Sequence, residues 1–303
     1  FLCFILQSYK TFMSMHLAGI IPVANLKTDF GIDTPAVLLP VCAGFTAIQK
    51  SVFECAMAGC ETIWIVANDD LAPIVRKVVG EWTYDPLYYS RRYERFPSEV
   101  RKEIPIYYVP VHPKDRDRRD SYGWSALYGI FCAWWVGVKI SKWVVPQKYF
   151  ISFPMNTYDI YSLRQHRQAI SDVDKNFFVS DMGKTVKDNI PLPFTMFGED
   201  YIQCRRWVNK QTTKQYCSPP PGEKYPSKKL PFEERWSARN FDFSEVFEKL
   251  ETKDAHHFET EWFYDISTWD GYVDYIASGN VIKKPYGPLT KAHKHSKLVI
   301  QEE

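Results

Sequence analysis

The sequence contains 303 residues, of which 45% are apolar and 24% are charged, so it is suited to a packed core and excludes a disordered chain or a coiled coil. The 38 lysines and arginines nearly balance the 36 acidic residues, and the net charge of +2 excludes a strong overall field for a nucleic-acid backbone. The 7 cysteines lack the close pairs of zinc sites or secreted disulfide frameworks, and no apolar run reaches the roughly 18 residues of a membrane span. We therefore expect a cytoplasmic protein that acts on neither nucleic acid nor membranes.

The first 14 residues are expected to lie outside the folded domain. The apolar opening, Phe1–Leu6, is too short for a membrane span and has no basic residues before it, so it is a weak signal peptide. Met13 and Met15 are both candidate start residues. We therefore interpret residues 1–14 as a non-native or disordered extension.

Short apolar segments alternate with segments of helical periodicity through the first half of the chain. The segment 62–67 is β-branched and apolar throughout, as in a strand that is buried on both faces. Strands are predicted at residues 17–24, 62–67, 104–111 and 150–153, and helices at 46–59, 71–82 and 121–137. Because parallel strands need crossover connections, this order predicts an α/β fold: an open, mostly parallel, Rossmann-like sheet covered by helices on both faces.

The second half contains a segment of different composition. Residues 205–231 are rich in proline, lysine and glutamine and include Ser218-Pro-Pro-Pro-Gly222, which is typical of a long insertion. A compact pattern then resumes, with a helix at 244–250, a strand at 256–265 and a helix at 269–277. We therefore predict a single α/β domain over residues 15–280, with an insertion at about 205–231 and a basic tail at 281–303.

Three separated segments carry a resemblance to a known family. Thr34-Pro-Ala-Val-Leu-Leu-Pro-Val41 is similar to a T-P-K-x-L-L-P-V segment, and Ala58–Ile63 is similar to the A-G-x-x-x-I that follows it. Near the other end, Trp262–Tyr272 is similar to W-x-D-I-G-T-x-x-x-Y. In this order, the segments resemble the sugar nucleotidyltransferases.

The resemblance implies a reaction, a cofactor and two substrates. Members of the family transfer a nucleotidyl group from a nucleoside triphosphate to a sugar 1-phosphate by in-line attack, and pyrophosphate leaves. The implied partners are thus a nucleoside triphosphate and a sugar phosphate, and the implied cofactor is Mg²⁺, a hard cation that takes oxygen ligands. The implied fold is the nucleotide-diphospho-sugar transferase type of α/β sheet.

The family's phosphate-binding loop is altered in this chain. Its pattern, L-A-x-G-x-G-T-R, falls on Pro22–Asp29, with Asn25 and Lys27 in place of glycines and Asp29 in place of the arginine. The lysine of T-P-K is likewise replaced, by Ala36. Two cations are thus missing where phosphates need neutralising, and Lys27 is the candidate substitute because lysine binds phosphate as a mobile point charge.

The candidate site residues follow from these alignments. Lys27 and the retained Thr28 are the candidate catalytic residues that hold phosphates. Ser121–Leu127 is similar to the family's G-T-A-x-A-L segment, which lies against the base and ribose, although Ser121 also fits a simple helix cap. The candidate substrate-binding residues are Ala24, Asn25, Asp120, Ser121 and Gly123.

The implied metal pair is half present. Asp265 occupies the aspartate position of W-x-D-I-G-T, and a turn or helix-capping aspartate is its structural alternative. The family's other aspartate follows the fourth strand and falls within Pro154–Asp159, where Asn156 or Asp159 are the candidates. The candidate metal ligands are therefore Asp265, Asn156 and Asp159.

Two other functions stay open at this stage. The loss of both phosphate-site cations favours a catalytically degenerate protein, a pseudoenzyme that binds a nucleotide or sugar nucleotide without turnover. A glycosyltransferase of related fold is the third alternative, because Asp115-Arg-Asp117 has the spacing of a metal-binding Asp-x-Asp motif. That motif lies in the charge run Lys114–Asp120, which is either a solvated loop or a phosphate-contacting loop.

Overall fold

The computed structural model describes residues 16–24, 26–31, 34–87, 102–116, 118–119, 121–141, 145–212, 216–226, 228–231, 234–235 and 237–285. The predicted extension at 1–14, the candidate residues Asn25 and Asp120, and the tail beyond residue 285 lie outside this range.

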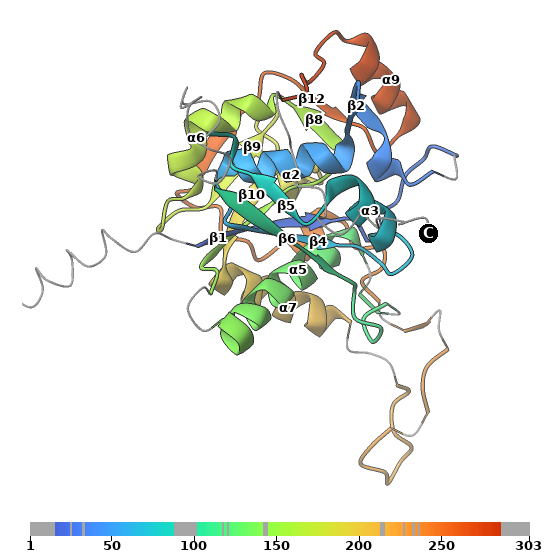
Figure 1. Ribbon diagram of the computed structural model, residues 1–303. Coiled ribbons are helices and arrows are strands. Elements are labelled where there is room, and N and C mark those ends of the chain that lie inside the picture. The colour runs from blue at the N-terminus through green and yellow to red at the C-terminus, as the bar shows by residue number, and fades with distance from the viewer. Residues whose placement is uncertain are drawn as a thin grey trace, which may run out of the picture.

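One eight-stranded sheet organises the molecule, in the strand order β11-β9-β10-β7-β1-β4-β6-β5 (Figure 1). The central strands β7, β1, β4 and β6 are mutually parallel, while β5 and β10 run antiparallel to their neighbours. The strands are β1 (Leu17–Pro22), β4 (Thr62–Val66), β5 (Trp82–Tyr84), β6 (Glu103–Val109), β7 (Lys148–Ile151), β9 (Phe177–Ser180), β10 (Phe194–Phe197) and β11 (His256–Glu259). The predicted mostly parallel α/β sheet is confirmed.

Helices cover both faces of this sheet. In Figure 1, α2, α3 and α6 lie on one side of it and α5 and α7 on the other. The helices are α2 (Ala47–Ala58), α3 (Ala72–Val79), α5 (Tyr122–Val136), α6 (Leu163–Ile170), α7 (Gly198–Gln211), α8 (Phe243–Val246) and α9 (Trp269–Ala277). Single turns occur at Ala36–Leu38, Gly137–Ser141, Ile160–Ser162 and Val186–Asp188.

Helix α2 shows how local sequence sets these boundaries. Thr46 and Gln49 form a capping box at its start, and Gly59 ends it in the left-handed conformation, with φ of 96°. A residue with a Cβ is disfavoured in that conformation, so glycine fits the position. The predicted helix at 46–59 is confirmed to within one residue at each end.

The core has two layers, one on each face of the sheet. Ile48 and Val52 of α2 pack with Val75 of α3 on one face. On the other face, Leu127 of α5 packs with Cys204 of α7. Among the described residues, no helix has the length and apolar character needed to cross a membrane.

Two short ladders lie outside the main sheet. Strand β2 (Pro40–Cys42) pairs with β3 (Phe45–Thr46), and β8 (Asn156–Tyr158) pairs antiparallel with β12 (Phe263–Asp265). The second ladder sets Asp265 opposite Asn156. It therefore joins the segment after β7 to the C-terminal part of the chain.

Several predicted boundaries differ from the structure. The strand predicted at 256–265 is two strands, because β11 pairs with β9 and the chain then leaves the main sheet to pair with β8. Residues 205–211, predicted as part of the insertion, complete α7, where Tyr201, Cys204 and Val208 are buried along one face. Helix α8 ends at Val246 instead of residue 250.

Candidate functional site

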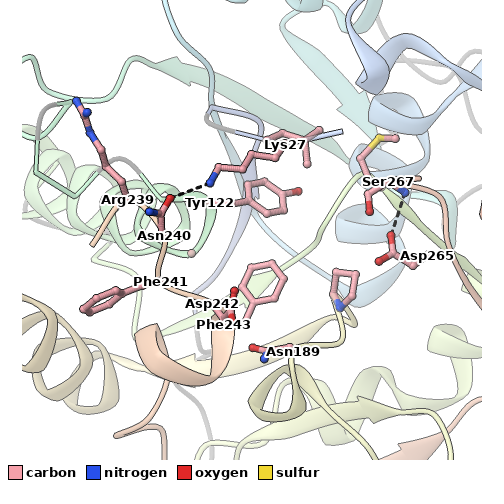
Figure 2. A pocket seen from close by; sticks show the side chains of 14 residues that line it. Lys27, Tyr122, Asn189, Arg239, Asn240, Phe241, Asp242, Phe243, Asp265 and Ser267 are labelled. Atoms are coloured by element: carbon pink, nitrogen blue, oxygen red, sulfur yellow. Dashed lines mark hydrogen bonds between the residues drawn. The ribbon is translucent and has the colours of Figure 1, made fainter. Parts of the chain in front are cut away.

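Two cavities open beyond the carboxyl ends of the parallel strands. The first, of about 270 Å³, is called the central pocket here; the second, of about 470 Å³, is called the adjoining pocket. The central pocket is lined by Leu26, Lys27, Tyr122, Gly123, Met155, Asn189, Pro191, Arg239, Asn240, Phe241, Asp242, Phe243, Asp265 and Ser267 (Figure 2). The adjoining pocket is lined by Val23, Ala24, Leu26, Thr28, Thr34, Pro35, Ala36, Val37, Asn68, Asp70, Leu71 and Ile74. Leu26 lines both, so the loop after β1 separates the two cavities.

This loop is held in place by the C-terminal part of the chain. The Lys27 ammonium donates a hydrogen bond of 3.1 Å to Asn240 Oδ1, and the backbone N–H of Asp29 donates to the carbonyl of Ser267 at 3.2 Å. Lys27 thereby reaches the central pocket, whereas Ala24 and Thr28 line the adjoining pocket. The two candidate catalytic residues, Lys27 and Thr28, thus lie on opposite sides of the same loop.

Arg239 also lines the central pocket, and its guanidinium points away from Lys27 (Figure 2). Its guanidinium donates to the carbonyl of Arg116 at 3.0 Å, and the neighbouring Ala238 N–H donates to the carbonyl of Arg118 at 2.7 Å. The charge run after β6 therefore packs against the segment that follows the insertion. Sequence reasoning missed Arg239 because it belongs to none of the three resembling segments, and only the fold brings it beside Lys27.

The charge run Lys114–Asp120 forms ion pairs within itself and with the loop after β4. Arg119 donates to Asp115 Oδ1 at 3.3 Å, and Arg116 donates to Asp69 Oδ2 at 2.9 Å. The Asp115 carboxylate is thus engaged by Arg119, and Asp117 lies outside the described residues. Within the described part of the chain, no cluster of three or more His, Cys, Asp or Glu side chains is suited to a metal ion. The Asp-x-Asp spacing that suggested a glycosyltransferase therefore stays a prediction.

Asp265 lies at the end of β12, on the wall of the central pocket. Its Oδ1 accepts a hydrogen bond of 2.9 Å from the backbone N–H of Ser267, which orients the carboxylate (Figure 2). Asp265 can therefore both stabilise the turn and bind a ligand, because a carboxylate that accepts one backbone N–H retains further lone pairs.

Tyr122 was not predicted and contributes a phenol to the pocket. Its ring contacts those of Phe153 and Phe243, with centroids 5.6 Å away in each case. Its hydroxyl is buried and has no hydrogen-bond partner among the described residues. Burial raises the pKa of Tyr122 well above its usual value, and the nearby negative charge of Asp265 raises it further. The phenol therefore stays protonated at neutral pH.

Ser121 and Gly123, the two candidate residues beside Tyr122, mainly stabilise helix α5 and its packing. Ser121 caps α5, accepting from the backbone N–H of Trp124 at 3.2 Å, and the structure does not bring its side chain to the pocket wall. Gly123 does line the pocket, but a Cβ there would meet Val246 at 3.0 Å. The small residue thus permits close packing of α5 on α8.

The candidate metal ligands after β7 do not reach the pocket. Asn156 is fully buried and its amide is bonded to Lys50 and to the carbonyl of Pro191. Asp159 caps the following turn by accepting from the backbone N–H of Tyr161 at 3.1 Å. Because successive side chains along an extended segment point to opposite faces, Met155 and not Asn156 lines the pocket. The structure thus places neither Asn156 nor Asp159 beside Asp265 on the pocket wall, where the thioether of Met155 lies instead.

Gly271, in the first turn of α9, presses against the Asp265 backbone. A Cβ built on Gly271 would overlap the carbonyl oxygen of Asp265 and lie 3.1 Å from Thr268 Oγ1. Because this neighbour is backbone, Gly271→Ala is expected to displace the turn and lower the free energy of unfolding by about 1–3 kcal/mol, measured by urea titration.

Gly198→Ala is the matched control, because it also adds one methyl group to a helix. A Cβ built on Gly198 meets nothing within 4 Å, so its stability is expected to stay the same or rise slightly. Equal losses in the two variants would contradict the overlap at Asp265.

Comparison with known proteins agrees with this architecture. No protein-family model matches the chain, and no curated protein sequence is similar to it. A crystal structure of UDP-glucose pyrophosphorylase complexed with UDP-glucose is similar with a TM-score of 0.50 and 12% identity, over 87% of this chain and 98% of that one. A protein described as a glucose-1-phosphate thymidylyltransferase from Bacillus anthracis, in complex with sucrose, is similar with a TM-score of 0.52 and 11% identity, over 89% of this chain and 97% of that one. The chain therefore has the α/β fold of the sugar nucleotidyltransferases.

Proposed function

We propose that this protein transfers a nucleotidyl group from a nucleoside triphosphate to a sugar 1-phosphate, with release of pyrophosphate. The observation that carries the proposal is that Lys27, Arg239 and Asp265 line one cavity at the carboxyl ends of the central strands. Ligands of open α/β sheets bind at this edge. The fold alone does not decide the activity, so the argument rests on the chemistry of the pocket.

The two cations suit the charge that the reaction must neutralise. In-line attack on the α-phosphorus leaves negative charge on the attacking and departing phosphates, and fixed cations stabilise that charge as it develops. Lys27 adds a mobile point charge, and the Arg239 guanidinium, on turning from the Arg116 carbonyl, would add a planar donor group that matches phosphate oxygens. Together they would offset the two cations that this chain has lost, at Asp29 and at Ala36. The adjoining pocket, with Thr28 and Ala24, offers room for the rest of a triphosphate ligand.

The carboxylates of the central pocket fit Mg²⁺ when substrate phosphates supply the other oxygen ligands. This ion is commonly held by one or two carboxylates together with substrate phosphates. Asp265 and Asp242 are the carboxylates that line the pocket and would hold it. When bound, Mg²⁺ supplies positive charge to the phosphates. The residues of the chain then bind and orient the substrates.

A second candidate function is binding of a nucleotide or sugar nucleotide without turnover. The observation that favours it is Met155, which lines the pocket at the end of β7, where the resemblance implies an aspartate. A thioether is a soft, weak ligand for a hard cation. Asp29 adds a negative charge in place of an arginine on the same loop.

One experiment separates these functions. The protein is incubated with Mg²⁺ and with pairs of nucleoside triphosphates and sugar 1-phosphates, and pyrophosphate release and thermal stability are both measured. Pyrophosphate release that requires both substrates supports transfer. Stabilisation by a ligand without pyrophosphate supports binding alone. A panel without either signal overturns both proposals.

The role of the two cations yields a separate prediction. Arg239→Ala and Lys27→Ala are each expected to weaken triphosphate binding by roughly tenfold, because each removes a charge-assisted hydrogen bond to phosphate. Arg239→Lys is expected to recover part of the loss, since it keeps the charge. Calorimetric titration measures the dissociation constants, with Arg206→Ala, an exposed residue of α7, as control. Unchanged affinity in both pocket variants would contradict phosphate binding there.

A further inference from the structure

A buried ion pair lies behind the central pocket. Lys50 and Glu54 are one turn apart on α2, their side chains are 0% exposed, and Lys50 Nζ lies 3.2 Å from Glu54 Oε2. A buried pair of this kind costs solvation and is often no more stabilising than apolar residues of the same volume. Stabilisation of the fold is therefore not a sufficient reason for this buried ion pair.

Among the described residues, the other hydrogen-bond partners of Lys50 and Glu54 lie on the segment that follows β7. Lys50 donates to Asn156 Oδ1 at 2.5 Å and to the carbonyl of Phe153 at 3.1 Å. Glu54 accepts from the hydroxyls of Ser152 at 3.0 Å and Tyr158 at 2.7 Å. Helix α2 thus binds both ends of the segment 152–158 through directional hydrogen bonds.

The same segment carries the strand that positions Asp265. In the β8–β12 ladder, Asn156 lies opposite Asp265, and the N–H of Ile266 donates to the carbonyl of Met155 at 3.1 Å. The ladder is separate from the main sheet, so its placement relative to the pocket depends on contacts such as those of Lys50. Asn156 also donates to the carbonyl of Pro191, a residue of the pocket wall.

We propose that Lys50 is a positioning residue that fixes the register and orientation of the Asp265 carboxylate through Asn156. Lys50 is too deeply buried to touch a ligand in the pocket. The directional hydrogen bonds of Lys50 and Glu54 hold the β8–β12 ladder at one place on the face of α2. Apolar packing alone would leave the ladder free to shift along the helix. The inference rests on the proposed role of Asp265 in the transfer reaction.

The test compares two buried lysines. Lys50→Met combined with Glu54→Gln removes both charges while leaving a side chain that accepts from Tyr158, so the variant has no unpaired buried charge. Lys148→Met is the matched control, because Lys148 is also fully buried and donates to the carbonyls of Asp172 and Lys175, at the amino end of β7 and away from the pocket. Lys50→Met alone is expected to displace the β8–β12 ladder further, because it leaves the Glu54 charge buried without a counter-ion, and it is used where it folds.

Hydrogen exchange of backbone amides gives a readout that needs no ligand. The double variant is expected to lose protection in residues 152–158 and 263–268 while β1 and β4 stay protected, and Lys148→Met is expected to leave 152–158 and 263–268 unchanged. Loss of protection throughout the sheet, or the same pattern in Lys148→Met, would show a structural role only and overturn the inference.

Kinetics supply the second readout. In the double variant, kcat is expected to fall by roughly 10²-fold, the effect of a displacement of about 1 Å, with the triphosphate dissociation constant within about twofold of the wild type. Equal kcat values would overturn the inference. Absence of turnover in the wild type would instead count against the proposed function, and hydrogen exchange would still decide whether Lys50 positions the ladder.

Discussion

Asp265→Asn is expected to lower kcat/KM for nucleotidyl transfer by roughly 10²-fold or more, because it removes a negative oxygen ligand worth several kcal/mol at a phosphate-bound cation. The amide is almost the same size and can still accept from the Ser267 N–H, so the fold is expected to be kept. Steady-state kinetics over a range of Mg²⁺ concentrations measure the effect. The loss is expected to be smaller at high Mg²⁺ if it arises from weaker ion binding.

The control for this change is Asp274→Asn, on the exposed side of α9. It removes the same charge from the same region but does not line the pocket, so its kcat/KM is expected to match the wild type. If both variants retain full activity, Asp265 holds no ion that matters to the reaction. Asp242 would then be the carboxylate to test.

Glu54→Gln is expected to cause the largest loss of stability, about 3–5 kcal/mol, because it leaves the Lys50 charge buried without its counter-ion. Burial lowers the pKa of Lys50, and the charge of Glu54 opposes that fall. Without Glu54 the lysine must either stay charged at a high cost or lose its proton on folding. Urea unfolding measures the change in free energy.

Exposed pairs provide the contrast for this prediction. Glu248→Gln breaks the contact between Glu248 and Lys249, two side chains that are 44% and 41% exposed, and is expected to change stability by less than about 1 kcal/mol. A loss at Glu54 no larger than at Glu248 would mean that water or a shift of the helix relieves the buried charge.

The regular part of the fold could be predicted from sequence. Residues 269–277 were predicted as a helix and form α9, and residues 62–67 were predicted as a strand and form β4, because periodicity and end signals agree there. Helix α7 and strands β9 and β10 were not predicted. Helix α7 mixes polar residues with a few buried ones, and β9 and β10 are apolar runs of only 4 residues each, too short for periodicity to identify.

The site could be predicted only in part, for a related reason. Lys27 and Asp265 were found because they lie in segments that resemble a family, and both line the central pocket. Arg239 reaches the pocket through tertiary packing that leaves no local pattern, and Tyr122 lies in the segment Ser121–Leu127 at a position where the family pattern indicates no phenol. Lys50 and Glu54, four residues apart in a helix, have the spacing of an ordinary exposed pair, and nothing local indicates that both are buried.

The hydrogen bond between Lys27 and Asn240 joins residues that are 213 positions apart, which has a consequence for how the protein is made. At the usual rate of translation, roughly 10–40 s pass between the synthesis of the two residues. In that interval β1 and its loop leave the ribosome before the pocket wall that carries Arg239 and Asp265 has been synthesised. A ligand of the proposed site would therefore bind only after the chain has been synthesised through Ser267, and it would not guide the early folding of the nascent chain.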